Sequence, residues 1–260
     1  MDGRRIKTLV ILILLTVNLF FGGIIIMQRA QSRGMEARER EELSRVMSDA
    51  GIELPPDMIP RAKALKRCSV VRDASLERAF AAALIGEAEP VEQGGGIVSY
   101  ENENGRATFR SGGEVEAVIF DKSALSASVR AEDYVAGLLG KSGFEIKNGE
   151  LVLSVGGMRV FNCVLTATAA DEGIVVEGRR LTGAPSESEE AAPVSAYTAL
   201  MAYLRAVSED GSVVKQIVGV TQGYVFEYSA SAGTLEPVWR IQSDGGAVYI
   251  SAVDAEIIRP

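Results

Sequence analysis

The chain has 260 residues, enough for one large or two small domains, and it combines a net charge of −8 with a complete lack of histidine. The lack of histidine excludes serine–histidine and cysteine–histidine catalysis and removes the commonest zinc ligand. Residues 1–33 hold five basic side chains and one acidic side chain, a net +4, so the remainder carries −12 and should be repelled by nucleic acid and anionic polymers.

An uncharged apolar stretch at residues 8–27 is the first element of the chain. As a helix, 20 residues span roughly 30 Å, the thickness of the hydrocarbon layer of a membrane. Arg4, Arg5 and Lys7 precede it, so the positive-inside rule places the N-terminus in the cytoplasm and the residues after about Arg29 outside the cell. A cleaved signal peptide is the alternative, but its apolar core is normally about 7 to 15 residues long, and no small-x-small cleavage site follows here.

Two residues of this span indicate contact with a partner helix. Asn18 lies near the middle of the span, and Gly22 lies four residues later on the same helical face. An amide inside a bilayer needs a hydrogen-bond partner, and glycine lets a second backbone come close. The alternative is that Asn18 is tolerated and touches only lipid.

A charged helix and a proline-rich spacer are expected after the span. Residues 1–29 would then form the cytoplasmic N-terminus and the membrane helix, and residues 30–60 the connection to the folded part. Within residues 33–50 the expected helix has a narrow apolar stripe, made by Leu43, Val46 and Met47. Three prolines in residues 52–60 forbid a helix and favour an extended path.

One pattern, a helix followed by antiparallel strands with glycine-marked turns, then occurs three times. The first unit, residues 61–126, has an expected helix at Ser75–Ile85. Its expected strands are Ile97–Tyr100, Ala107–Arg110 and Val115–Phe120. The pair Asn104-Gly105 between two of these strands is typical of a β-hairpin.

The remaining region, residues 127–260, contains two further units separated by an acidic stretch at residues 183–193 that is expected to be a loop. The second unit has a helix at Ala131–Leu139 and turns at Asn148-Gly149 and Gly156-Gly157. The third has a helix at residues 195–207 whose expected buried side chains are Tyr197, Leu200, Met201 and Leu204. Its expected strands are Val213–Tyr228, Pro237–Gln242 and Ala247–Ala252.

The expected fold class is therefore α+β. One N-terminal transmembrane helix is followed by an extracytoplasmic region of repeated units, each with one helix and an antiparallel meander. In such units the helix covers one face of its own sheet.

Two short motifs resemble functional sequences, but neither has the required context. Gly140-Lys141-Ser142 resembles the end of a phosphate-binding loop, yet Val135 stands where that loop needs a glycine, so Gly140 is expected to cap a helix. Ser212-Val213-Val214-Lys215 matches the Ser-x-x-Lys of penicillin-recognising enzymes, yet on a strand residues three apart face opposite sides. No catalytic, cofactor-binding or metal-ligating residue is predicted.

Three other side chains bear on the folded part. Cys68 and Cys163 lie far apart in the sequence and either pair across a long loop or are buried thiols. Trp239, the sole tryptophan, stands in an apolar strand and is expected in the core.

Two separated stretches together resemble one known family. The N-terminal stretch consists of Met1-Asp2, Arg5-x-Lys7-Thr8 and a helix with Asn18-Leu19-Phe20. The C-terminal stretch consists of Val214-Lys215-Gln216-Ile217, Gly223-Tyr224, Pro237-Val238-Trp239-Arg240-Ile241, Val248-Tyr249-Ile250-Ser251-Ala252 and Asp254-Ala255-Glu256. In this order they resemble the YycI-type proteins of Firmicutes, and the last portion is also similar to PepSY-like modules.

The resemblance implies a non-enzymatic accessory protein of a two-component system, one that regulates a membrane sensor histidine kinase controlling cell-wall metabolism. In that family a single membrane helix contacts the membrane helices of the kinase, beside a related accessory protein. The contact is expected at Asn18, Leu19, Phe20 and Gly22, with the C-terminal domain extracellular and no cofactor. Self-association stays open.

Two alternatives to this function remain. A PepSY-like envelope binding module would inhibit or sense a peptidase or a ligand. A wall-processing enzyme would need a serine–lysine or two-carboxylate site, and no spacing in the sequence identifies one.

Overall fold

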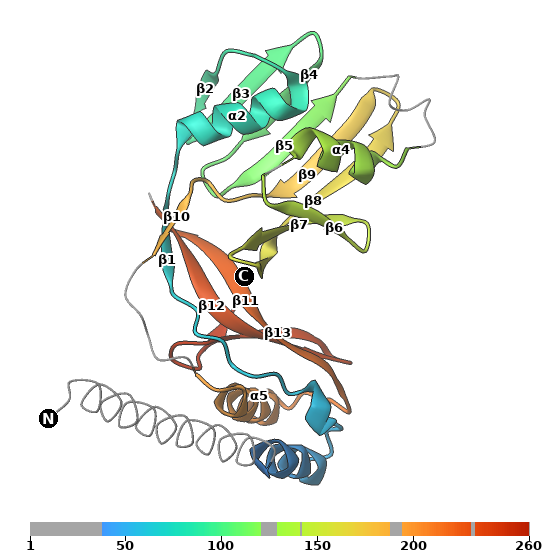
Figure 1. Cartoon of the computed structure of the whole chain (residues 1–260), viewed down its shortest axis with the longest axis vertical. Helices are drawn as coiled ribbons and strands as arrows, with labels where there is room; N and C mark the ends of the chain where they lie inside the picture. The colour runs from blue at the N-terminus through green and yellow to red at the C-terminus, as the bar shows by residue number, and fades with distance from the viewer. Residues whose placement is uncertain (1–37, 121–128, 141, 188–193, 230–231, 260) are drawn as a thin grey trace, which may run out of the picture. The chain divides into compact units, whose positions relative to one another are not determined.

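The structure is a computed structural model that describes residues 38–120, 129–140, 142–187, 194–229 and 232–259 (Figure 1). The chain divides into two compact units, Met1–Ile59 and Pro60–Pro260. The membrane span predicted at residues 8–27, with Asn18, Leu19, Phe20 and Gly22, lies outside the described residues. Within the described ranges, no helix has the length and apolar character needed to cross a membrane.

The described part of the first unit is a helix followed by an extended segment. The helix covers residues 38–49, and its Leu43 and Met47 side chains are buried, as the apolar stripe predicts. The Ser44 hydroxyl donates to a carbonyl oxygen ten residues later at 2.6 Å, so the segment after the helix folds back onto it. A short 3-10 helix, η1 (Pro56–Met58), completes this unit.

The second unit contains three helices and one sheet in its described residues. The helices are α2 (Ala74–Ile85), α4 (Ala131–Leu139) and α5 (Ala196–Asp210). The strands up to the middle of the chain are β1 (Cys68–Val71), β2 (Val91–Gly94), β3 (Ile97–Asn102), β4 (Gly105–Phe109), β5 (Glu114–Ile119), β6 (Phe144–Lys147) and β7 (Glu150–Val155). The later strands are β8 (Met158–Ala170), β9 (Gly173–Arg179), β10 (Pro185–Glu187), β11 (Ile217–Ser229), β12 (Ala232–Ser243), β13 (Gly246–Ser251) and β14 (Ile257–Ile258).

All these strands belong to one hydrogen-bonded, 14-stranded sheet, so the predicted fold class is wrong. Its main path runs β10-β1-β12-β11-β8-β9-β5-β4-β3-β2, while β13 and β14 extend from β12, and β7 and β6 extend from β8. Among the described strands, neighbours are antiparallel except β11 and β8, which are parallel, so the sheet is mixed. The described strands therefore form one continuous sheet and not a series of separate helix-plus-meander units.

The junction between β8 and β11 explains this error. The two strands share one backbone pair, Tyr224 with Val160. Two residues further along, the Asn162 side chain donates to the carbonyl of Phe226 and accepts from its N–H, both at 2.8 Å. The Asn162 amide therefore continues the ladder and satisfies backbone groups that would otherwise lack partners. Such a pairing joins residues 64 positions apart, which hydrophobic periodicity cannot reveal.

The order of β1 and β10 adds a second long-range connection. β1 lies between β12 and β10 and is antiparallel to both, although it precedes β2 in the sequence. The predicted acidic loop at residues 183–193 therefore begins with a strand, and its residues 188–193 lie outside the described part.

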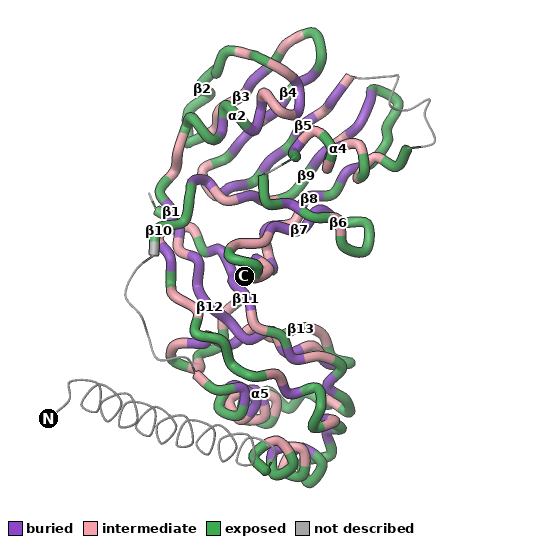
Figure 2. The backbone as a smooth tube through the Cα atoms, in the orientation of Figure 1, coloured by how far each residue is buried: buried purple, intermediate pink, exposed green. Residues whose placement is uncertain are grey.

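Helices α2 and α4 lie on the same face of the sheet, over β3 to β5 and β8 (Figure 1). Asp73 caps α2, because its carboxylate accepts the N–H groups of Ser75 and Leu76, and these bonds, with one from the Ser75 hydroxyl, lower the pKa of Asp73. Phe80 of α2 packs edge-on against Phe109 of β4 with ring centres 6.1 Å apart. Figure 2 shows the buried residues along the central strands beneath these helices.

Helix α5 packs on β12 and β13, but its buried face differs by one residue from the predicted face. The observed stripe is Ala196, Ala199, Leu200 and Tyr203. Tyr197, which was predicted to be buried, is 39% exposed. The helix starts one residue later than predicted because Ser195 is its N-cap, and small alanines let its backbone approach the sheet.

Trp239 and the two cysteines, the other side chains that the sequence singled out in the folded part, are all buried. Trp239 is fully buried, as predicted, and its Nε1 donates to the carbonyl of Val194 at 2.9 Å. Of the two alternatives for the cysteines, the structure has thiols: Cys68 in β1 and Cys163 in β8 are both buried and do not form a disulfide. Burial raises the pKa of the Cys163 thiol to about 12.

Candidate functional site

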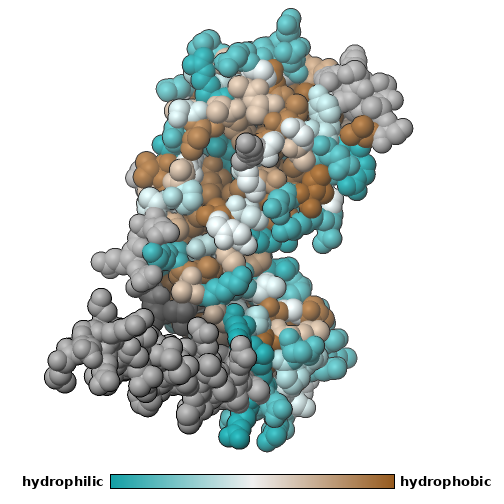
Figure 3. All heavy atoms as spheres, viewed as in Figure 1, coloured by the Kyte–Doolittle hydropathy of each residue, from teal (hydrophilic) through white to brown (hydrophobic). Residues whose placement is uncertain are grey.

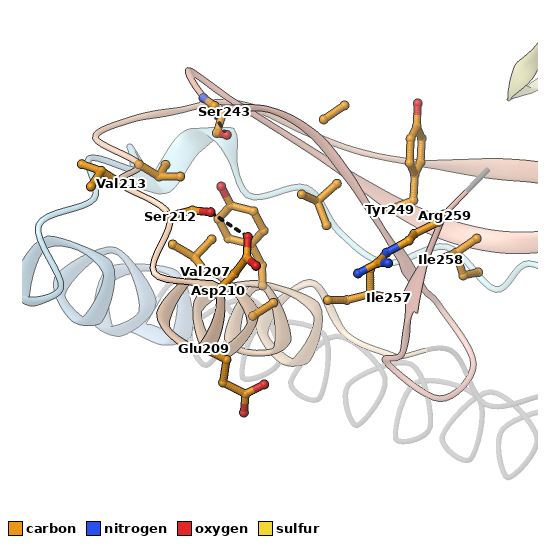
Figure 4. A pocket seen from close by; sticks show the side chains of 16 residues that line it. Val207, Glu209, Asp210, Ser212, Val213, Ser243, Tyr249, Ile257, Ile258 and Arg259 are labelled. Carbon is orange, nitrogen blue, oxygen red and sulfur yellow. Dashed lines mark hydrogen bonds between the residues drawn. The ribbon is translucent and has the colours of Figure 1, made fainter.

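A pocket of about 920 Å³ opens between the C-terminal half of α5 and the sheet edge formed by β13 and β14 (Figure 4). Small-ligand sites in proteins typically enclose roughly 300–1,000 Å³. The aliphatic part of the lining consists of Val207, Val213, Val214, Val248, Ile257 and Ile258. We call this cavity the α5 pocket.

The segment that leaves α5 closes one end of the pocket. Gly211 ends the helix with a left-handed φ of +68°, a conformation that glycine adopts without strain. The chain then returns toward β11, and the Asp244 carboxylate holds it by accepting the N–H groups of Lys215 at 3.2 Å and Gln216 at 3.4 Å. This carboxylate therefore fixes the position of Ser212 and Val213 in the wall.

The helix end that faces this segment is acidic. Glu209 and Asp210 are the last two residues of α5, and the last turn has no basic residue. A helix C-terminus carries partial negative charge, so carboxylates there are unfavourable and a cation is favoured. Glu209 points away from the pocket in Figure 4 and pairs with Arg205 at 2.7 Å, whereas Asp210 accepts a hydrogen bond from the Ser212 hydroxyl at 2.9 Å. Asp210 is thus the acidic group of the pocket.

Tyr203 contributes a buried hydroxyl. The residue is 1% exposed, and within the described part of the chain its hydroxyl oxygen lacks a hydrogen bond of good geometry. Burial raises the pKa of this hydroxyl, and the nearby Ser243 hydroxyl opposes the shift. Ser243 itself donates to the carbonyl of Gly246 at 3.1 Å and accepts from the N–H of Gly245 at 3.2 Å. Ser243 therefore keeps one acceptor lone pair close to the Tyr203 hydroxyl, which lines the pocket as a buried polar group.

Arg259 lies on the other side of the pocket from Asp210 (Figure 4). It follows β14, which pairs with β13 through Tyr249 with Ile258 and thereby positions the guanidinium at the rim. Within the described part of the chain, Arg259 and Asp210 each have no ion-pair partner. The pocket therefore presents an acid and a base on opposite sides of an apolar wall.

The hydroxyl groups and charges of this pocket are suited to hydrogen bonding and ion pairing with a ligand. The Ser212 hydroxyl has only the exposed Asp210 carboxylate beside it, and a carboxylate in water is a weak base toward a serine. No three acidic or cysteine side chains lie close enough to hold a metal ion in the residues that the structure describes.

A second cavity, about 380 Å³, lies between α2, α4 and the β7 hairpin, where apolar side chains gather in Figure 3. Arg180 lines it and is 5% exposed, with its guanidinium 5.2 Å from the Phe80 ring and 5.0 Å from the Phe109 ring. It donates to the carbonyl of Leu181 at 3.0 Å and pairs with Glu77 at 3.5 Å. Burial lowers the pKa of Arg180, and the Glu77 carboxylate opposes this shift. These contacts fix α2 on the sheet.

The residues that the sequence singled out have different outcomes. Asn18, Leu19, Phe20 and Gly22 lie outside the described residues. Gly140 caps α4 through its N–H bond to Ala136, as predicted. Ser212 and Lys215 precede β11 in an irregular segment, so the Ser-x-x-Lys match has no helical turn.

Sequence reasoning missed Tyr203, Asp210 and Arg259. A signal for Asp210 was present, since two adjacent acidic residues end a helix that lacks a basic last turn. Nothing in the sequence placed Arg259 in the same pocket as that helix, because its position depends on the pairing of β13 with β14.

Neither a protein-family model nor a curated protein matches this chain. Its structure is similar to the crystal structure of an uncharacterized protein from Eubacterium rectale ATCC 33656. The TM-score is 0.45 at 9% sequence identity, and the match covers 77% of this chain and 86% of that one.

Proposed function

We propose that this chain is a membrane-anchored accessory protein that regulates a sensor histidine kinase of a two-component system and performs no chemistry of its own. The observation that carries the proposal is the α5 pocket, whose acid, base and hydroxyl suit the recognition of a ligand. The folded part would be the extracytoplasmic sensing module. The kinase as partner rests on the resemblance of the two terminal stretches to YycI-type proteins.

Membrane anchoring is supported by the apolar residues 8–27 and by the basic residues before them. Within this segment Asn18, Leu19, Phe20 and Gly22 would contact the membrane helices of the kinase, beside a related accessory protein. Regulation requires only that the chain bind one signalling state of the kinase better than the other. A ligand in the α5 pocket would change that preference, and by linkage the kinase would change the affinity for the ligand.

Recovery of the kinase with the tagged full-length chain from native membranes tests the proposal. The double variant Asn18→Leu with Gly22→Leu should recover about fivefold less kinase or lower, because the amide and the close backbone approach are lost. The double variant Thr16→Leu with Gly23→Leu makes the same kinds of change on another helical face and should recover the wild-type amount. Equal recovery by both double variants would exclude this contact face, and no kinase with the wild type would exclude the function.

The α5 pocket also supports a second candidate, a PepSY-like envelope module that inhibits or senses a peptidase. The same recovery experiment separates the two functions. A peptidase in place of a kinase, recovered equally by both double variants, would favour this second candidate.

A further inference from the structure

The geometry points to a short peptide with free amino and carboxyl ends as the ligand class of the α5 pocket. This inference rests on the proposed function, because it identifies what the sensing module would recognise. Three features carry it: the charges at the two sides, the apolar side chains of the lining, and the buried Tyr203 hydroxyl, which lacks a hydrogen bond of good geometry within the described residues.

The pocket has a negatively charged group, Asp210, on one side and a positively charged group, Arg259, on the other, so it suits a ligand that carries both charges. Asp210 ends α5, so its carboxylate and the negative end of the helix dipole both favour an ammonium group. Arg259 presents a guanidinium, whose planar donors match a carboxylate. A ligand with a single charge would leave one of these groups without a partner, whereas a zwitterion satisfies both.

Apolar side chains also line the pocket. Ile257 and Ile258 lie beside Arg259 in Figure 4, Val207 lies next to Asp210, and Val248 belongs to the same lining. The apolar wall suits small aliphatic side chains better than a sugar or a phosphate ester, which would leave hydroxyl or phosphate oxygens without donors. The volume of about 920 Å³ accommodates a few residues.

Tyr203 supplies the observation that is independent of charge. A hydroxyl that is almost fully buried normally has a hydrogen-bond partner, and a peptide carbonyl in the pocket would provide one.

Isothermal titration of the full-length chain in detergent with the peptide Ala-Val-Ala, up to about 5 mM, tests the inference. Acetylation of the amino end or amidation of the carboxyl end should each weaken binding about tenfold, because each removes one charged contact. Asp210→Asn should weaken the free peptide but leave the acetylated peptide unchanged, and Arg259→Gln should do the same for the amidated peptide. Tyr203→Phe should weaken all three peptides without lowering the unfolding temperature.

The control variants are Glu116→Gln and Arg106→Gln, both exposed on β5 and β4 and distant from α5 in the sheet order; they should bind as the wild type does. Failure of Ala-Val-Ala to bind, equal affinity for the doubly capped peptide, or insensitivity to both Asp210→Asn and Arg259→Gln would overturn the inference. The recovery of the kinase is measured separately, so loss of peptide binding with retained kinase recovery would reject the ligand class and leave the proposed function standing.

Discussion

Glu77, on the buried face of α2, forms ion pairs with two arginines, Arg72 and Arg180. It is 2% exposed, and its carboxylate accepts from Arg72 at 3.0 Å and from Arg180 at 3.5 Å. Breaking a buried ion pair by removing one partner is costly, because the other charge stays buried without compensation. The aromatic rings beside Arg180 cannot replace a carboxylate, since a cation–π contact is weaker than a paired charge.

Glu77→Gln should therefore lower the free energy of unfolding by about 3–5 kcal/mol, as measured by urea denaturation. The matched control is Glu89→Gln, because Glu89 is 85% exposed and pairs with Arg78 at the surface. That control should change stability by less than about 0.5 kcal/mol. Equal effects of the two variants would show that the buried network does not hold α2.

Cys163 gives the molecule a pH dependence in the alkaline range. Its folded pKa is about 12, above the value of about 8.5 for an exposed thiol, so the folded state keeps a proton that the unfolded state releases. The stabilisation is complete below about pH 8.5 and decreases as the pH rises toward the folded pKa. Between pH 9 and 10 the unfolding free energy should fall with a slope of up to about 1.4 kcal/mol per pH unit from this thiol.

Urea denaturation at several pH values checks the slope. Cys163→Ala removes the group and should reduce the slope between pH 9 and 10, leaving the smaller contribution of Tyr100 and Tyr203, whose pKa values burial also raises and which begin to ionise in the unfolded state. The same slope in Cys163→Ala and in the wild type would assign the pH dependence to another group.

Among the elements, α5 shows what a local sequence signal reveals and what it does not. The helix itself was predictable from its apolar spacing, but its buried face was predicted one residue too far along, which concealed Tyr203. The acidic end of α5 breaks a rule of helix stability, and residues that break local rules are typical of functional sites.

Asp210→Asn should raise the free energy of unfolding by about 0.3–1 kcal/mol, because it removes a carboxylate from the negative end of the helix dipole. The amide oxygen can still accept the hydrogen bond from Ser212, so this bond is not the cause of any change. Thermal unfolding of the full-length chain without peptide measures the effect. A lower unfolding temperature would mean that Asp210 has a structural role that the pocket does not explain.

Asn162 is the polar side chain that joins β8 to β11. Asn162→Ala removes both bonds to Phe226 and should destabilise the protein by about 2 kcal/mol, because a backbone N–H and a carbonyl lose their partners. Thr166→Ala on the exposed part of the same strand is the control and should cost less than about 0.5 kcal/mol in urea denaturation. If the two variants unfold alike, the Asn162 bridge does not stabilise the sheet.

Over the whole molecule, signals between neighbours in the sequence were informative, and pairings between distant segments were not. The Asn148-Gly149 turn was predicted correctly, since both residues have positive φ angles, 55° and 84°. The strand before it, β6, was missed because it has only four residues, although Phe144 and Ile146 alternate with Glu145 and Lys147. The position of β1 beside β12 was equally hidden. The α5 pocket depends on such distant pairings, because β13 and β14 bring Arg259 to the side of the pocket opposite Asp210, and it was therefore not predictable.

The central claim is that the chain acts on a membrane kinase through its apolar segment, with the α5 pocket as sensor. The most direct measurement is the autophosphorylation rate of the recovered kinase in lipid vesicles, with and without the full-length chain. The rate should change when the wild-type chain is present and should stay at its basal value with the Asn18→Leu, Gly22→Leu double variant. An autophosphorylation rate that is the same with the wild-type chain, with the double variant and with neither would contradict the claim.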